Sequence, residues 1–214
     1  TTNPLCQVTE WLCRSCELGF DERVITNEKD MSEIIERNPN KKLPVLQDGD
    51  LLLTEGCAIL KYISELAIER GNCTKWPGFG KNDAKSNAKN DDLLAFSQSM
   101  VKSTILEYLH NMNQVFYDSV PDNSKIEKLN AVITELDYKK KGKSFMVSNS
   151  LTISDLYLFS LLYPLVSRNA FNWDKNKRLE GWFRVVTKII RNEWTDEKQC
   201  LNCYESDSDE EDLL

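Results

Sequence analysis

Lys41-Lys42-Leu43-Pro44-Val45-Leu46-Gln47-Asp48-Gly49-Asp50-Leu51-Leu52-Leu53-Thr54-Glu55-Gly56-Cys57-Ala58-Ile59-Leu60 is the stretch that decides the fold. Two short apolar runs, 45–47 and 51–53, flank Asp48-Gly49, which is a strong turn signal, so the stretch predicts a β-hairpin. Apolar residues then recur at helical spacing through residue 67, and Thr54 is a suitable N-cap, so a helix follows. The N–H groups at the start of this helix could hold an anion, or the junction could be purely structural.

The residues before this stretch complete most of an α/β domain. A helix is predicted from Pro4 to Leu18, a strand at 22–25, and a short helix that ends at Asn38-Pro39. With the hairpin and its helix, this order matches a thioredoxin-like β-α-β-α-β-β-α domain without its first strand. Only Thr1, Thr2 and Asn3 precede the first helix. We therefore expect the natural protein to carry several more apolar residues upstream, which supply the inner strand of a mixed sheet.

The second half of the chain is helical in pattern. Capping boxes are predicted at Ser124-x-x-Glu127 and Thr152-x-x-Asp155, and the helix after Thr152 is apolar nearly all round, so it should be buried. We expect four parts, with disorder predicted for the last from its composition. They are a thioredoxin-like domain at 1–70, a linker rich in Gly and Pro at 71–82, an all-helical domain at 83–194 and an acidic tail at 195–214.

These motifs together resemble the cytosolic glutathione transferase superfamily. The Lys42-Leu43-Pro44-Val45-Leu46 run is similar to a Lys-Val-Pro-Val-Leu run that carries a cis proline in that family. Thr54-Glu55-Gly56 is similar to the Thr-Glu-Ser that opens the family's third helix. The box at Thr152 and its buried helix resemble the core of the family's all-helical domain. The similarity runs from about Pro4 to Trp194 and most resembles the theta-like branch.

The resemblance implies a glutathione site on the thioredoxin-like domain. Lys42 would meet a carboxylate of glutathione, and Glu55 would meet its amino group. The backbone of Leu43, just before Pro44, would pair with the cysteinyl unit as a strand does. Gly56 stands where the family usually has Ser, so one hydroxyl donor is lost. A hydrogen bond to a charged group contributes about 1.5–3 kcal/mol.

The residue that activates the glutathione thiol should lie at the start of the first helix. A donor there stabilises a thiolate, which is the true nucleophile. Under the family's pattern, Asn3 takes the activating position, and a shift of one residue would give Thr2 and its hydroxyl instead. Cys6 is the thiol nearby. The alternative is that Asn3 and Cys6 only cap and pack the helix.

Composition excludes several other classes of protein. The net charge is −7, but six acidic residues and no basic residue lie at 204–214, so the rest of the chain is close to neutral and nucleic-acid binding is not expected. The lysines at 139–141 and 143 are predicted to be a solvated helix end. No run approaches the roughly 18–20 apolar residues that a membrane helix needs, so no membrane insertion is expected.

Cysteine usage indicates reduced thiols. Seven cysteines, an odd number that includes several within predicted helices, favour a cytoplasmic location. Cys13-x-x-Cys16 and Cys200-x-x-Cys203 have metal-ligand spacing, but neither is followed by a convincing second ligand pair, and the chain has one His. We expect no metal site and no cofactor.

The sequence therefore predicts a glutathione transferase that joins the glutathione thiolate to a small apolar electrophile, as in detoxification. Glutathione is a substrate in this reaction. The resemblance also implies a homodimer. The alternative is a non-catalytic member of the fold that serves as an interaction or structural subunit, and Gly56 and Asn3 are the departures that favour it.

Overall fold

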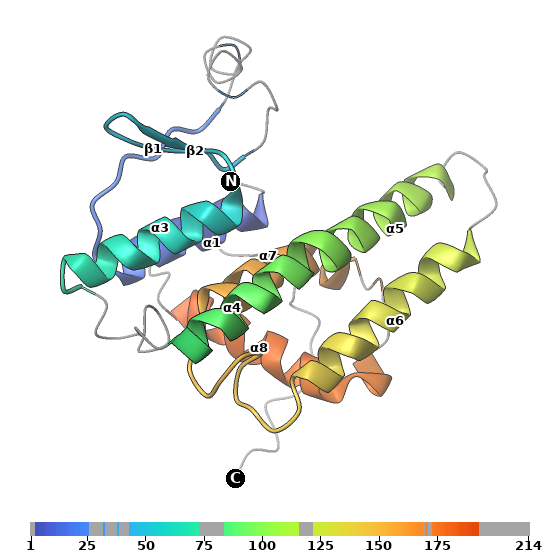
Figure 1. Ribbon diagram of the computed structural model, residues 1–214. Helices are drawn as coiled ribbons and strands as arrows, with labels where there is room; N and C mark the ends of the chain where they lie inside the picture. Colours follow the sequence, from blue (N-terminus) through green and yellow to red (C-terminus); the bar gives the residue numbers. More distant parts are fainter. Residues whose placement is uncertain are drawn as a thin grey trace.

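The structure is a computed structural model that describes residues 3–25, 32, 38, 43–72, 84–115, 122–168, 170 and 173–192. It has the two-part architecture expected from the sequence, an N-terminal thioredoxin-like domain followed by an all-helical domain (Figure 1). The elements of the first part are α1 (Pro4–Ser15), β1 (Leu46–Asp48), β2 (Leu51–Leu53) and α3 (Gly56–Glu69). The second part contains α4 (Ala84–Phe96), η1 (Ser97–Val101), α5 (Lys102–Val115), α6 (Asn123–Lys139), α7 (Ile153–Val166), η2 (Trp173–Lys175) and α8 (Lys177–Asn192).

The predicted hairpin is present, with its turn one residue later than expected. Asp48 pairs with Leu51, so the loop residues are Gly49 and Asp50. Gly49 has a φ of 58°, a conformation that glycine adopts without strain. The Tyr62 hydroxyl donates to the Asp48 carboxylate at 2.6 Å, and this bond ties the hairpin to α3.

The prediction of a strand at 22–25 is wrong. These residues are described and have no regular secondary structure. Among the described residues the sheet has two strands, β1 and β2, which pair with each other. A strand exists through its ladder of hydrogen bonds, and apolar residues alone do not supply that pairing. The domain boundaries at 70 and 83 stay predictions, because residues 73–83 lie outside the described part.

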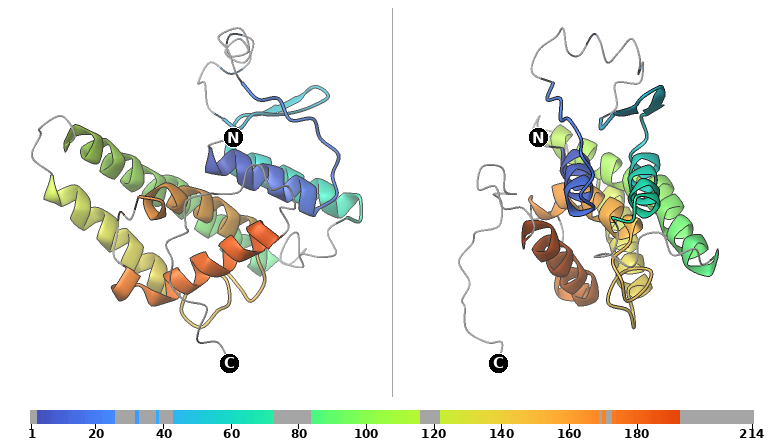
Figure 2. Two further views of the ribbon diagram at one scale, coloured as in Figure 1. Left: turned by 180° about the vertical axis from the view of Figure 1, so that it is seen from behind. Right: turned by 90° about the vertical axis from the view of Figure 1, so that its left-hand side faces the viewer.

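Helices α1 and α3 lie side by side and run in the same direction. Leu5 at the start of α1 faces Gly56 at the start of α3. Beyond their other ends, the Asn72 side chain donates to the Glu17 carbonyl at 3.4 Å. Both helices pack on α7, as the two views of Figure 2 show. The amino ends of α1 and α3 therefore meet at one edge of the domain.

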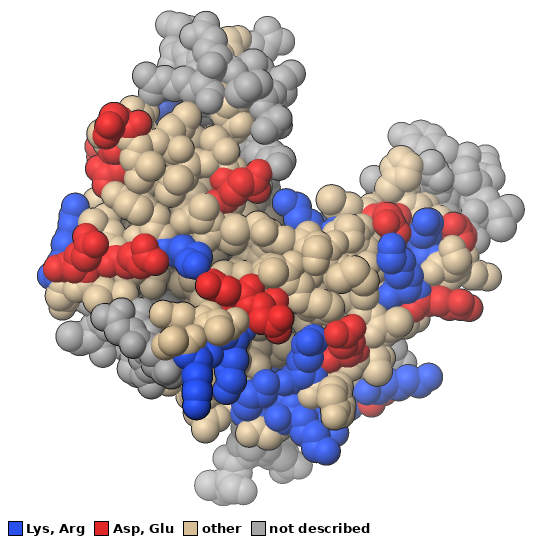
Figure 3. Space-filling view, viewed as in Figure 1, with Lys and Arg blue, Asp and Glu red and all other residues tan. Residues whose placement is uncertain are grey.

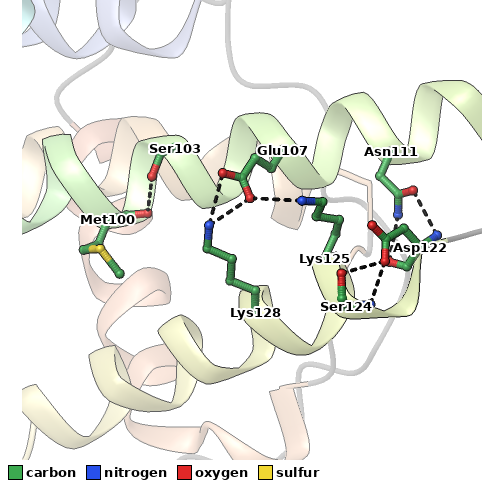
Figure 4. Close-up of polar contacts among 8 residues, drawn as sticks. All are labelled: Met100, Ser103, Glu107, Asn111, Asp122, Ser124, Lys125 and Lys128. Carbon is green, nitrogen blue, oxygen red and sulfur yellow. Dashed lines mark hydrogen bonds and ion pairs between the residues drawn. The ribbon is translucent and has the colours of Figure 1, made fainter.

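Helices α4, η1 and α5 form one continuous run with a π-helical turn at Ser97–Val101. Helix α6 packs against α5 in the opposite direction, and Glu107 joins them by ion pairs to Lys128 at 2.8 Å and Lys125 at 3.7 Å (Figure 4). The capping box predicted at Ser124 is wrong. The N-cap is Asp122, whose carboxylate accepts from the Ser124 N–H and hydroxyl at 3.0 and 2.6 Å.

Helix α7 forms the core of the helical domain, as its apolar sequence predicted. The capping box at Thr152 is confirmed, since the Asp155 carboxylate accepts from the Thr152 backbone N–H at 2.9 Å. Helix α7 has 14 residues and is buried along most of its length. In the part of the chain that the structure describes, no helix has the length and apolar character needed to cross a bilayer.

Basic side chains gather below α4, over its start and the end of α6 (Figure 3). Two of the lysines there have structural partners. The Lys140 ammonium donates to the Lys143 carbonyl, and the Lys143 ammonium donates to the Met146 carbonyl at 2.7 Å. Burial lowers the pKa of Lys143, and the nearby charges of Lys140 and Lys89 lower it further. These contacts order the loop between α6 and α7. Lys140 and Lys143 therefore have a structural role that the prediction of a solvated helix end did not include.

Two buried hydroxyls, on Ser97 and Thr104, have no hydrogen-bond partner among the described residues. A buried unpaired hydroxyl costs about 1–3 kcal/mol. Thr104→Val keeps the shape of the side chain and removes the hydroxyl. We expect it to raise the free energy of unfolding by about 1 kcal/mol in a urea titration.

Thr187→Val is the matched control, because the Thr187 hydroxyl donates to the Phe183 carbonyl at 2.8 Å. This control should gain no stability. If Thr104→Val is less stable than the parent chain, the expectation is wrong.

Candidate functional site

The start of α1 is organised by Asn3. Its side-chain oxygen accepts from the N–H groups of Leu5 at 2.9 Å and Cys6 at 3.3 Å, so Asn3 is the N-cap of the helix. Pro4 follows at the first helical position, where its missing N–H costs nothing. The cap occupies the amide oxygen of Asn3. Its amide nitrogen is the part of the side chain that can donate to a ligand.

The start of α3 lies one residue later than predicted. Its N-cap is Glu55, so the prediction that Thr54 is the N-cap is wrong. Within the described residues, Glu55 makes no side-chain hydrogen bond to cap the helix. The first N–H groups of α3 are therefore not covered by the side chain of the N-cap, and they carry the positive end of the helix dipole.

The two helix starts touch through Leu5 and Gly56. A Cβ at position 56 would overlap Leu5 Cδ2, and it would lie 3.2 Å from Leu5 Cγ and 3.3 Å from Leu5 Cδ1. Because α1 and α3 run in the same direction, the positive ends of both dipoles face the same region. Such a region favours an anion such as a carboxylate or a thiolate.

The hairpin side of the site contains a cis peptide bond between Leu43 and Pro44. The resemblance implied a cis proline at this position, and the structure confirms it. Leu43 is exposed, with 36% of its surface accessible, and Pro44 is buried. Two residues that were predicted to take part, Lys42 and Thr2, lie outside the described residues.

The helical domain faces the start of α3 with polar side chains that the sequence analysis did not select. The Gln98 amide donates to the Cys57 sulfur at 2.7 Å. Burial raises the pKa of Cys57, and hydrogen bonds from backbone N–H groups oppose that effect. Burial, together with the charge of a Cys57 thiolate, raises the pKa of Tyr157 to about 12. Lys61 of α3 also forms an ion pair with Asp91 of α4 at 2.8 Å.

These contacts were hard to foresee. Gln98 lies in the π-helical turn, which no local pattern announced, and π-turns are frequent at functional sites. The available signals were Cys57 directly after Gly56 and the polar hydroxyl of Tyr157 on a largely apolar helix.

Cys6 is half-buried and free of disulfide bonds. Burial raises its pKa, and the charge of Glu22 raises it further. Burial likewise raises the pKa of Cys13 to about 11. Both groups are therefore thiols at neutral pH and poor nucleophiles. Among the described residues no group of His, Cys, Asp or Glu side chains is arranged to hold a metal ion.

Comparison with known proteins identifies the family of the N-terminal domain and the fold of the chain. Residues 2–65 match the family model described as "Glutathione S-transferase, N-terminal domain". The chain is 23% identical to human glutathione S-transferase theta-1 over 197 residues, which cover 86% of this chain and 79% of that protein. It is 27% identical to mouse glutathione S-transferase theta-3 over 156 residues, covering 70% of this chain and 62% of the relative.

Solved structures show the same fold. A Bombyx mori glutathione transferase aligns with a TM-score of 0.74 and 17% identity, covering 88% of this chain and 85% of that one. Human glutathione S-transferase T1-1 in its apo form aligns with a TM-score of 0.73 and 22% identity, covering 87% and 80% of the two chains.

A thioredoxin-like domain joined to an all-helical domain in this way is the glutathione transferase fold. Residues 2–65 carry the N-terminal domain of the glutathione S-transferase family, and the chain is similar to theta-class glutathione S-transferases at 23% to 27% identity.

Proposed function

We propose that this protein binds glutathione where the amino ends of α1 and α3 meet, and that it joins the glutathione thiolate to a small apolar electrophile. The meeting of these two helix ends is the observation that carries the proposal. Two aligned dipoles stabilise both a carboxylate and a thiolate, and a stabilised thiolate is the reactive form. This role would fit the detoxification of electrophiles.

The proposal assigns thiol activation to a hydrogen-bond donor. The raised pKa of Cys6 argues against mixed-disulfide chemistry at that thiol. The amide nitrogen of Asn3 can donate, since the cap uses only the amide oxygen. The hydroxyl of Thr2, the residue before Asn3, is the other candidate. Catalysis would then come from positioning the two reactants and lowering the thiol pKa.

The glutathione contacts follow from the same proposal. Lys42 would bind a carboxylate, the backbone of Leu43 before the cis Pro44 would pair with the cysteinyl unit, and Glu55 would bind the amino group. Gly56 contributes only its backbone N–H. Glutathione enters as a substrate, and no further cofactor is assigned.

The first test is binding and conjugation. We expect immobilised glutathione to retain the protein, and free glutathione to raise its melting temperature. We expect turnover of a chloro-nitro aromatic, and Cys6→Ser should keep that activity within about threefold, because a protonated thiol contributes no nucleophile. Cys13→Ser, on the buried face of the same helix, is the matched control for packing effects. A loss of activity in Cys6→Ser but not in Cys13→Ser would contradict the assignment of thiol activation to a hydrogen-bond donor.

A second candidate function is a non-catalytic subunit with the same fold. The contact between Leu5 and Gly56 favours it, because a side-chain hydroxyl cannot be placed at the start of α3 without moving Leu5. A folded protein that neither binds to immobilised glutathione nor turns over the aromatic would support this candidate over the enzyme.

We also propose a homodimer in the cytoplasm, on the basis of family membership and of the free cysteines among the described residues. The molar mass in solution, measured by light scattering, tests whether the protein is a homodimer.

A further inference from the structure

One contact in the site belongs to this chain in particular. The branched end of Leu5 fills the space beside the Gly56 backbone, with its Cγ and both of its terminal methyl carbons within 3.3 Å of a Cβ at that position. Leu5 is partly buried and packs against the core, so moving its side chain away from Gly56 would change those core contacts. Any residue larger than glycine at position 56 must therefore displace Leu5, and overpacking of this kind destabilises a fold.

The contact has a consequence for binding. Gly56 is the first residue of α3, where the N–H groups that have no carbonyl partner within the helix collect. The leucine keeps that position without a side chain, so an anion there is held by backbone N–H groups beside an apolar wall.

We call the space beside the Gly56 backbone at the start of α3 the anion seat. We propose that Leu5 is the specificity-determining residue of this anion seat. It excludes a hydroxyl at position 56 and so sets how tightly a carboxylate of glutathione is held. The inference rests on the proposed function for the identity of the ligand. It goes further by naming the side chain responsible for the missing donor, and by implying that the donor can be restored once that side chain is shortened.

The experiment is a double-mutant cycle with glutathione as the probe. The proteins are the parent chain, Leu5→Ala, Gly56→Ser and the double variant Leu5→Ala/Gly56→Ser. Isothermal titration measures the affinity for glutathione, and thermal unfolding reports folding. Gly56→Ser alone should melt at a lower temperature and bind no better than the parent. The double variant should bind about 10- to 100-fold more tightly than Leu5→Ala, the gain expected from one donor to a charged group.

Gly56→Ala in the same two backgrounds is the matched control, because it adds the Cβ without the hydroxyl. It should lower the melting temperature when Leu5 is present and have little effect beside Leu5→Ala. It should not improve binding in either background. In steady-state kinetics the added hydroxyl should lower the KM for glutathione and leave kcat nearly unchanged, which a purely structural role would not produce.

The outcomes separate the two proposals. Gly56→Ser that binds more tightly with an unchanged melting temperature overturns the inference, and so does a double variant that binds no more tightly than Leu5→Ala. If the parent binds glutathione in either case, the proposed function survives. If the parent does not bind and the double variant does, the inference stands and the proposed function fails. If all variants fold and none binds, both fail.

Discussion

Asp155→Ala should lower the free energy of unfolding by about 3–5 kcal/mol, because it leaves a cluster of buried donors without an acceptor. One carboxylate oxygen accepts from the Met146 N–H at 2.8 Å and from the Trp182 indole N–H at 2.9 Å. The other accepts from the Thr152 N–H at 2.9 Å and the Thr152 hydroxyl at 2.6 Å. Urea unfolding, followed by tryptophan fluorescence and by circular dichroism, measures the change.

The size of this effect follows from burial. Asp155 is fully buried, and burial raises its pKa although the four hydrogen bonds oppose that effect. Water cannot replace the carboxylate when it is removed, so each donor carries its own desolvation cost. Trp182→Phe removes one donor and keeps the ring, and should cost about 1.5–3 kcal/mol.

A second carboxylate serves as the comparison. Asp137 accepts from the Leu179 N–H at 2.9 Å and from Arg178, which is half exposed, at 2.8 Å. Asp137→Ala should therefore cost clearly less than Asp155→Ala. Equal costs for the two variants would show that the number of buried donors is not what sets the loss.

The sequence predicted the parts of this network that are local. The box at Thr152 places two groups three residues apart on one helix end, so spacing alone predicts their bond. The same logic located the hairpin, through Gly49 and its neighbours. The partners of Asp155 in the preceding loop and in α8, Met146 and Trp182, come from tertiary packing and have no signature in spacing.

The candidate site divides in the same way. Asn3 could be selected from the pattern at the start of α1, and the cis bond before Pro44 followed from the resemblance to the family. The role of Leu5 could not be foreseen, since it depends on how closely α1 and α3 approach. From the sequence alone, Gly56 meant only that the hydroxyl donor of a serine is missing. In the structure, Leu5 occupies the space that a side chain at position 56 would need. Gln98 was missed because its direction depends on the π-helical turn.

Asn3→Asp should shift the pH profile of conjugation upward by about one unit or more, whichever residue donates to the thiolate. The new carboxylate keeps the acceptor for the Leu5 and Cys6 N–H groups, and a negative charge at a helix start is favourable, so stability should hold. The same charge disfavours a nearby thiolate and raises the pKa of the glutathione thiol. At pH 6.5, kcat/KM should fall about tenfold, and raising the pH should restore much of it.

Two companion variants identify the donor. Asn3→Ser keeps an oxygen for the cap and carries no charge, so a large loss of activity in this variant would assign the donor to the amide nitrogen of Asn3. Thr2→Ala leaves the cap intact, and a large loss there would assign the donor to the hydroxyl. If the pH profile of Asn3→Asp matched that of the parent while both proteins turned over the aromatic, the thiolate would lie too far from Asn3 to feel its charge. The start of α1 would then serve only as a helix cap, and thiol activation would have to come from the N–H groups of α3 and the residues around Cys57.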